Sequence, residues 1–273
     1  MRLGGVPPNG RTYSSEGSTV NADNSFNPFS LKGKRVLVTG ASSGLGQAIA
    51  LSFARMGAEV IATARDRERL TKTFEELQSI SDLPHQMILA DLTIAEERNA
   101  VVAALGSEIH GLVHSAGISR LCPTRMMTDT HLQEVHAINF EAPMLLTQGV
   151  LKRNLVADDG SILFLSSIAA HIGVAGVGAY SASKAALIAA SRCLAMELVK
   201  RRIRVNCLSP SLVETPILAE TAKVTSLDQL LEDYPLGFGR PDDIANAAIF
   251  MISGASRWIT GTTLVMDGGL TIS

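Results

Sequence analysis

A tyrosine and a lysine four residues apart offer the clearest chemistry in the sequence. Tyr180 and Lys184 enclose the run Tyr-Ser-Ala-Ser-Lys, and on a helix this spacing places both side chains on one face, with Cβ atoms about 5–6 Å apart. A phenol is a poor acid or base near pH 7, because its ordinary pKa is about 10. A neighbouring ammonium favours the phenolate and lowers that pKa. The pair is therefore suited to giving a proton to a carbonyl oxygen or taking one from an alcohol.

Ser167 is the third candidate for this chemistry. It precedes Tyr180 by thirteen residues and follows the apolar run 161–166, which is typical of a buried strand. Such a position lies at the carboxyl edge of a parallel sheet, where open α/β folds bind ligands. Taken singly, Tyr180 also fits an aromatic at a helix start and Lys184 its solvated partner, so the position of the three together carries the prediction.

A glycine-rich turn follows the first predicted strand. Three glycines lie in Thr-Gly-Ala-Ser-Ser-Gly-Leu-Gly over residues 39–46. Glycine lets the backbone approach a pyrophosphate, and the helix that follows offers free N–H groups and a partial positive charge. The alternative is a glycine-rich turn without a ligand, but strand, turn and helix each fall where nucleotide binding requires them. We expect a dinucleotide to contact Gly40, Ser42, Ser43, Gly44, Leu45 and Gly46.

The end of the second predicted strand bears on the choice of dinucleotide. NAD-binding proteins commonly place an acidic residue there to bind the ribose 2′-OH, whereas this chain has Ala64 followed by Arg65. A guanidinium can hold a 2′-phosphate through paired hydrogen bonds, with help from Arg67 or Arg69, so we predict NADP(H) rather than NAD(H). NAD(H) stays possible because Asp66 is a rival ribose ligand, and Arg65 also fits a solvated helix start.

Strands and helices must alternate to position these residues. Short β-branched runs predict strands at 35–39, 59–63, 86–90, 111–115, 161–166, 204–208 and 262–266. Longer patterns predict helices at 44–56, 66–79, 94–105, 130–154, 180–200 and 241–253. This alternation indicates a parallel, doubly wound sheet. We expect one α/β domain with a Rossmann fold, seven parallel strands and helices on both faces, over residues 30–273.

Composition is consistent with a large aliphatic interior. Hydrophobic residues make up 46% of the 273 residues, aromatic residues only 4% and charged residues 18%. A sheet covered on both faces by helices requires many Ala, Val, Ile and Leu side chains. The formal net charge of −2 argues against a nucleic-acid-binding protein, which usually has a strong basic excess.

Cysteine usage and hydropathy bear on location. Cys122, Cys193 and Cys207 cannot all pair within one chain and show no metal-ligand spacing, so we predict reduced thiols, no bound metal and a cytoplasmic location. Residues 1–29 are polar and are predicted to form a disordered extension, with an interaction arm as the alternative. The uncharged run 160–183 contains serines, a histidine and glycines, and it predicts a buried strand and a loop rather than a membrane span.

Together these motifs resemble the short-chain dehydrogenase/reductase family over nearly everything from residue 31 to residue 270. The matching positions are Thr39, Gly40, Gly44, Gly46, Asp91, Leu92, Ala116, Gly117, Asn139, Ser167, Tyr180 and Lys184. The resemblance implies that Tyr180 is the general acid/base, that Lys184 lowers its pKa and holds the nicotinamide ribose, and that Ser167 orients a substrate carbonyl. It also implies that Asn139 fixes a water in a proton relay with the lysine.

The resemblance extends the set of cofactor-binding residues and reveals two departures. The implied residues are Asp91, which contacts the adenine, Leu92, Ala116, Gly117, Pro210, Val213 and Thr215, besides Tyr180 and Lys184. Where the family usually has Asn-Asn before Ala-Gly, this chain has His114-Ser115, and we interpret His114 as a bonded structural group. Where the family has Pro-Gly, it has Pro210-Ser211, which can constrain that loop.

The sequence indicates the class of substrate and the oligomeric state only in general terms. The C-terminal half is most like 3-oxoacyl-acyl-carrier-protein reductases, while sugar, steroid and polyol dehydrogenases share similar tails. We therefore expect a carbonyl or alcohol substrate, either free or carried by an acidic protein that contacts Arg120 and Arg125. Residues 216–234 are expected to form a cap of mixed polar and apolar character over this substrate. The resemblance also implies a homotetramer. The alternative of another class is a dinucleotide-sensing regulator that has lost the chemistry.

Overall fold

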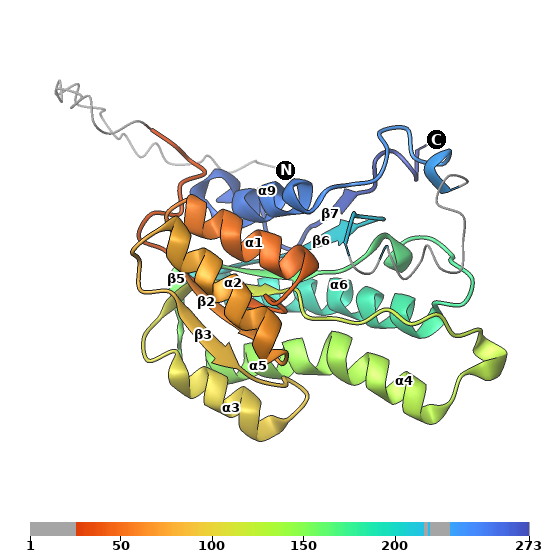
Figure 1. The fold of residues 1–273 in the computed structure, drawn as a ribbon, viewed down its shortest axis with the longest axis horizontal. Coiled ribbons are helices and arrows are strands. Elements are labelled where there is room, and N and C mark those ends of the chain that lie inside the picture. The colour runs from red at the N-terminus through yellow and green to blue at the C-terminus, as the bar shows by residue number, and fades with distance from the viewer. Residues whose placement is uncertain (1–25, 216–217, 219–229, 273) are drawn as a thin grey trace, which may run out of the picture.

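Seven parallel strands form one sheet in the order β3-β2-β1-β4-β5-β6-β7 (Figure 1). The computed structural model describes residues 26–215, 218 and 230–272. The strands are β1 (Arg35–Thr39), β2 (Glu59–Ala64), β3 (Gln86–Leu89), β4 (Ile109–His114), β5 (Val156–Leu165), β6 (Arg204–Pro210) and β7 (Thr263–Met266). The predicted doubly wound parallel sheet is confirmed.

Helices cover both faces of this sheet (Figure 1). One face carries α1 (Gly44–Arg55), α2 (Arg67–Ile80) and α9 (Pro241–Ile252). The other carries α3 (Ala95–Ala104), α4 (Asp129–His136), α5 (Ala142–Lys152) and α6 (Gly178–Leu198). The single-domain Rossmann architecture expected from the alternation of strands and helices is therefore present.

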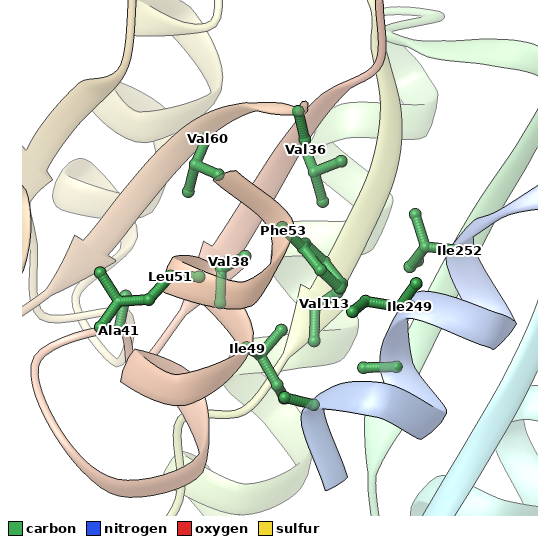
Figure 2. Close-up of a cluster of buried hydrophobic side chains, with 14 of the residues drawn as sticks. Val36, Val38, Ala41, Ile49, Leu51, Phe53, Val60, Val113, Ile249 and Ile252 are labelled. Carbon is green, nitrogen blue, oxygen red and sulfur yellow. The ribbon is translucent and has the colours of Figure 1, made fainter. Parts of the chain in front are cut away.

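Each central strand contributes side chains to two separate cores. In β1, Val36 and Val38 join the core beneath α1 and α9, while Leu37 joins the core beneath α3, α5 and α6, because successive strand residues point to opposite faces. Figure 2 shows the first core, in which Phe53 of α1 lies close to Ile249 of α9. Full burial stabilises each such side chain by about 1.5–3 kcal/mol, which explains why these strands read as continuous apolar runs.

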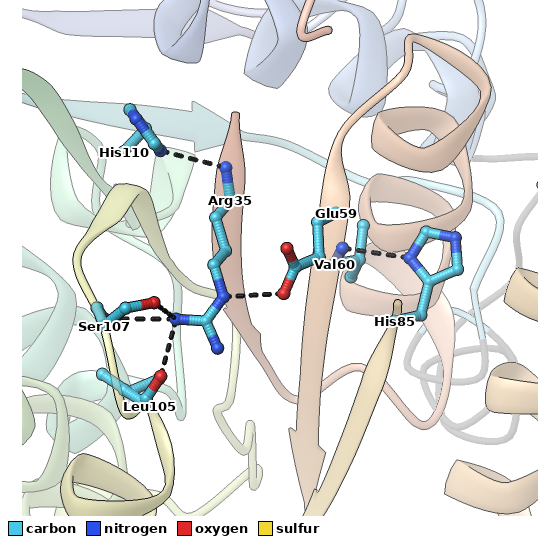
Figure 3. Close-up of polar contacts among 7 residues, drawn as sticks. All are labelled: Arg35, Glu59, Val60, His85, Leu105, Ser107 and His110. Carbon is cyan, nitrogen blue, oxygen red and sulfur yellow. Dashed lines mark hydrogen bonds and ion pairs between the residues drawn. The ribbon is translucent and has the colours of Figure 1, made fainter. Parts of the chain in front are cut away.

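Side-chain contacts add to the strand pairing at the amino ends of β1 and β2 (Figure 3). The Arg35 guanidinium pairs with Glu59 at 2.6 Å and donates to the carbonyl of Leu105 at 2.6 Å. The Nδ1 atoms of His110 and His85 accept from the backbone N–H groups of Arg35 and Val60, at 3.1 and 3.0 Å. Burial lowers the pKa of both histidines, which keeps Nδ1 available as an acceptor.

One predicted helix is wrong as a continuous element. The expected helix over 130–154 consists of α4, a π turn, η2 (Ala137–Glu141), and α5. Pro143 stands at the start of α5, and proline has no N–H to donate to the carbonyl of Asn139, four residues earlier. The ladder of hydrogen bonds is therefore re-spaced at Asn139, one of the candidate site residues.

A second difference concerns β5, which starts five residues before the predicted strand. Asp159 adopts a positive φ of 61°, and the pairing of β5 with β4 shifts register between Ile109 and Gly111. The two aspartates at 158 and 159 interrupt the apolar pattern, so that pattern does not indicate the earlier start.

The chain termini bear on the predicted extension. The carbonyl of Pro28 accepts from the N–H of Ala255 at 3.0 Å, and the Phe29 ring lies 6.2 Å from that of Phe250. Residues 1–25, and with them most of the predicted disordered extension, lie outside the described residues. Within the described ranges, the three cysteines are free thiols, and no helix is long and apolar enough to cross a membrane.

Candidate active site

A cavity of about 450 Å³ lies at the carboxyl ends of the strands. It extends across β1 and β4, which are neighbours in the sheet although β2 and β3 come between them in the chain. A crevice at such a reversal of strand order is where doubly wound folds bind ligands. The cavity is lined by every predicted cofactor-binding residue and by Ser167, Tyr180 and Lys184: Gly40, Ser42, Ser43, Gly44, Leu45, Gly46, Arg65, Asp91, Leu92, Ala116, Gly117, Pro210, Val213 and Thr215.

The glycine turn forms one wall and depends on the absence of side chains. Gly40 has a φ of 66°, and a Cβ there would lie 2.7 Å from the backbone nitrogen of Ala116. A Cβ on Gly46 would lie 2.2 Å from the carbonyl oxygen of Gly40. The Ser43 side chain makes no capping hydrogen bond to α1, so the first-turn N–H groups stay available beside the cavity, as anion binding requires.

Charged side chains gather at the β2 end of the cavity. The Arg65 guanidinium lies 3.9 Å from the Asp91 carboxylate and is largely exposed. Burial alone would raise the pKa of Asp91, but hydrogen bonds from Thr93 and the charge of Arg65 bring it below its ordinary value. Asp91 therefore stays ionised and can accept hydrogen bonds from a ligand.

The rival ligand Asp66 already has a structural task. Its carboxylate caps α2 by accepting from the N–H of Arg69 at 3.0 Å, and the Arg69 guanidinium lies 3.4 Å away. Arg69 lines the cavity together with Arg65, whereas Arg67 is not among the described residues that line it. Asp66, and not Arg65, caps α2, and the exposed Arg65 guanidinium also fits the alternative of a solvated helix start.

Ser167, Tyr180 and Lys184 meet beside the end of β5. Tyr180 forms a side-chain hydrogen bond with Ser167, and the Lys184 Nζ lies 5.8 Å from the centre of the tyrosine ring. Two serine hydroxyls form hydrogen bonds with backbone carbonyls at the start of α6. Ser166 donates to the carbonyl of Lys184 at 2.9 Å, and Ser183 donates to the carbonyl of Tyr180 at 2.7 Å.

The predicted effect of Lys184 on Tyr180 is wrong in this structure. Burial raises the pKa of Tyr180, and the hydrogen bond with Ser167 offsets only part of that rise. The Lys184 ammonium is directed to the carbonyl of Leu165, at 2.7 Å, rather than to the phenol. Burial also lowers the pKa of Lys184 to about 8, so near neutral pH the lysine can give up a proton and the tyrosine keeps its own.

Asn139 lies behind the cavity wall and is fully buried. Its Oδ1 accepts from the N–H of Ile118 and its Nδ2 donates to the carbonyl of Ile118, both at 2.9 Å. Nδ2 also lies 3.1 Å from the hydroxyl of Ser183. A Cβ on Gly117 would lie 3.1 Å from Asn139 Oδ1 and 3.3 Å from Lys184 Nζ. Asn139 thus joins the loop after β4 to the start of α6, beside the lysine.

A family model described as Enoyl-(Acyl carrier protein) reductase matches residues 40–271. The 3-oxoacyl-[acyl-carrier-protein] reductase FabG of Thermotoga maritima is 35% identical over 248 residues, 89% of this chain and 99% of the relative. The chain belongs to the short-chain dehydrogenase/reductase family.

Two further relatives of this short-chain dehydrogenase/reductase differ in their named substrates. The D-threitol dehydrogenase of Mycolicibacterium smegmatis is 37% identical over 248 residues, 89% of this chain and 95% of the relative. A putative NAD(P)-dependent gluconate 5-dehydrogenase from Beutenbergia cavernae, solved with bound NADP at low occupancy, superposes with a TM-score of 0.84 at 30% identity. It covers 90% of this chain and 100% of the other.

The two departures in this short-chain dehydrogenase/reductase have distinct outcomes. His114 is a bonded structural group, as predicted: its Nε2 contacts the Thr147 hydroxyl at 2.8 Å and its ring stacks on Phe164, with centroids 4.8 Å apart. Because the single hydroxyl hydrogen of Thr147 is donated to the carbonyl of Pro143 at 2.8 Å, His114 must donate from Nε2. Ser211 lines the cavity, and its hydroxyl lies 2.6 Å from that of Tyr234.

Several cavity residues were missed by the sequence analysis. Ile138 and Pro143 reach the wall through the π turn, which no periodicity revealed, and Ile118 directly follows Ala116 and Gly117. Of the expected cap, 216–217 and 219–229 lie outside the described residues, while Leu218 lines the cavity. Arg120, expected to meet an acidic carrier, is paired with Glu134.

Proposed function

We propose that the chain is an oxidoreductase that reduces a ketone to a secondary alcohol, or catalyses the reverse, with NADP(H) and with Tyr180 as general acid/base. One observation supports this most strongly. Ser167, Tyr180 and Lys184 line the same cavity as the glycine turn, so a proton donor and a dinucleotide cradle face one space.

The described residues fit a dinucleotide along the whole cavity. Gly40 and Gly46 leave the space that a Cβ would fill, and the first turn of α1 offers donors to a pyrophosphate. Lys184 is the residue we assign to the nicotinamide ribose, and the loop 210–215 to the carboxamide. Bound NADPH supplies the hydride in this chemistry.

The chain's own residues then divide the proton chemistry. Ser167 donates a hydrogen bond to the substrate oxygen and orients it, and Tyr180 gives that oxygen its proton. The raised pKa of Tyr180 suits this direction, because the phenol is protonated at neutral pH. Lys184, with a pKa of about 8, returns a proton to the tyrosine, and Asn139 holds the neighbouring backbone in place.

NADP(H) is proposed over NAD(H) on the charges at the β2 end. Two arginines, Arg65 and Arg69, line the cavity there, and a guanidinium suits a phosphate. Asp66, the carboxylate that follows β2 and could bind a ribose hydroxyl instead, is engaged as the cap of α2. The bound NADP of the Beutenbergia protein supports the same choice.

The substrate is proposed to be 3-oxoacyl-like, with a sugar or polyol as the second candidate. The Thermotoga relative supports the first, and the Mycolicibacterium relative supports the second. A regulator that senses dinucleotide without turnover is the alternative of another class, and the complete set Asn139, Ser167, Tyr180 and Lys184 argues against it.

A single panel tests these proposals. Purified protein is given NADPH or NADH with 3-oxoacyl thioesters, keto-sugars and cyclic ketones, and oxidation is followed by absorbance. We expect turnover with NADPH and a 3-oxoacyl thioester. Turnover only with keto-sugars would reassign the substrate, a preference for NADH would reassign the cofactor, and binding without turnover on every compound would favour the sensor.

A further inference from the structure

Two hydroxyl groups meet where the loop after β6 passes the cavity. The Oγ of Ser211 lies 2.6 Å from the phenol oxygen of Tyr234. Ser211 lines the cavity, whereas Tyr234 is only 8% exposed and its ring packs edge-on against Phe238, with centroids 5.2 Å apart. One hydroxyl is thus buried and fixed, and its partner borders the ligand space.

The backbone around this pair is interlocked. Ser211 donates from its N–H to the carbonyl of Met266 in β7 at 2.9 Å. Gly239 donates to the carbonyl of Leu212 at 3.0 Å and accepts from the N–H of Glu214 at 2.9 Å. These backbone hydrogen bonds hold the loop 210–215 on both sides, so the hydrogen bond between the two hydroxyls is not needed to keep the loop folded.

Counting hydrogens shows what the pair adds. Two hydroxyls carry two hydrogens, and one hydrogen bond between them uses one. If the buried phenol donates to Ser211, the serine keeps its own hydrogen for a partner in the cavity. In the opposite arrangement the phenol hydrogen has no acceptor among the described residues, and an unpaired buried hydroxyl costs free energy.

The position along the sheet identifies which end of a dinucleotide this hydroxyl meets. Ser211 follows β6, and Arg65 follows β2, with β1, β4 and β5 between them. Four strand spacings correspond to about 19 Å. If Arg65 holds the 2′-phosphate, Ser211 lies at the nicotinamide end, next to Ser167 and Tyr180 after β5.

We propose that Ser211 donates a hydrogen bond to the nicotinamide half of the bound dinucleotide, and that Tyr234 is the positioning residue that directs it by donating to its Oγ. This inference rests on the proposed function for the identity of the cofactor. The glycine that the family usually has at this place has no side chain with which to make such a contact.

The test measures dissociation constants of NADPH and NADH by cofactor fluorescence, without turnover. Ser211→Ala and Tyr234→Phe should each weaken binding about fivefold, the loss of one net hydrogen bond. The double variant should lose no more than the weaker-binding single variant, because both remove the same contact. The ratio between NADPH and NADH should stay unchanged, since both share the nicotinamide half.

Two further variants separate positioning from folding. Ser211→Thr keeps the hydroxyl and should bind within about twofold of the parent. Thr271→Val removes a hydrogen bond of equal length, 2.6 Å to Asp267, from a residue outside the lining of the cavity, and should leave both constants unchanged. Thermal melting should place all five variants close to the parent.

Unchanged affinity in Ser211→Ala overturns the inference, as does a loss confined to NADPH or an additive loss in the double variant. Weaker binding in the two single variants, together with no turnover on any ketone, would support this contact and overturn the proposed function. A parent protein that binds neither dinucleotide overturns both.

Discussion

At the scale of the residue, the site is arranged around two groups whose pKa values are shifted in opposite directions. Burial raises the pKa of Tyr180 and lowers that of Lys184 to about 8, because a low-dielectric surrounding disfavours each charged form. The sequence predicted that Tyr180 and Lys184 lie on one helix face, but it predicted the opposite direction for the shift of the Tyr180 pKa. Spacing reveals that two side chains share a helix face, but not that the ammonium turns to the carbonyl of Leu165.

Arg65 provides a prediction at the same scale. Arg65→Ala should weaken NADPH binding about 10- to 100-fold and change NADH binding little, because only NADPH brings a phosphate to the guanidinium. The matched control is Arg67→Ala, at a position that is not among the described lining residues. Fluorescence titration gives both constants, and an equal loss for the two dinucleotides would show that Arg65 does not read the phosphate.

At the scale of the element, the π turn between α4 and α5 sets the site. Such turns are rare and often mark functional positions. Here Pro143 removes the hydrogen bond that an α-helix would make to the carbonyl of Asn139. The Asn139 side chain forms two hydrogen bonds with the backbone of Ile118. A periodicity scan finds one long helix because the apolar spacing continues across the turn.

Pro143→Ala tests the importance of this turn. Alanine supplies the missing N–H and favours a regular helix, which would draw Asn139 away from Ile118. We expect the melting temperature to stay equal or rise while kcat falls about tenfold, a cost of about 1.4 kcal/mol in the barrier. Retained kcat, with circular dichroism showing intact folding, would mean that the turn is not required for activity.

At the scale of the whole molecule, the buried histidine couples stability to pH. Burial lowers the pKa of His114 from 6.5 to about 3, so between these values the unfolded chain takes up a proton that the folded chain refuses. The free energy of unfolding must therefore fall as pH drops below 6.5, by about 1.4 kcal/mol per pH unit. His85 and His110, whose pKa values are also lowered, act in the same direction.

Urea unfolding at pH 7.5 and pH 5 measures this coupling. Between these pH values, His114→Asn should lose about 2 kcal/mol less than the parent, because one of the contributing groups is gone. The other two histidines remain in the variant and serve as an internal reference. An identical pH dependence in the two proteins would mean that His114 is protonated alike in both states.

Assembly is a further prediction at this scale. The family resemblance predicts a homotetramer, and Met196 on α6 and Leu145 on α5 are large apolar side chains left 74% and 46% exposed. Light scattering should give a mass of four chains, and Met196→Glu should lower it. A parent protein of one-chain mass would contradict the prediction.

The fold was predictable from sequence because apolar runs and helical patterns repeat along the chain. For the candidate site, the sequence predicted a list of residues but not the contacts between them. Seven apolar runs alternate with helical patterns and so predict the sheet, since its central strands are buried on both faces. The hydrogen bond between Ser211 and Tyr234, the capping role of Asp66 and the pairing of Arg120 with Glu134 depend on contacts between segments far apart in the chain. No local pattern reports those contacts.

The most direct measurement is the turnover of Tyr180→Phe. Phenylalanine keeps the ring and removes only the proton donor. We expect turnover of the best ketone in the panel to fall at least about 100-fold, with the dissociation constant of NADPH close to that of the parent. A variant that binds NADPH normally and still reduces the ketone at the parental rate would contradict the central claim, that Tyr180 transfers the proton.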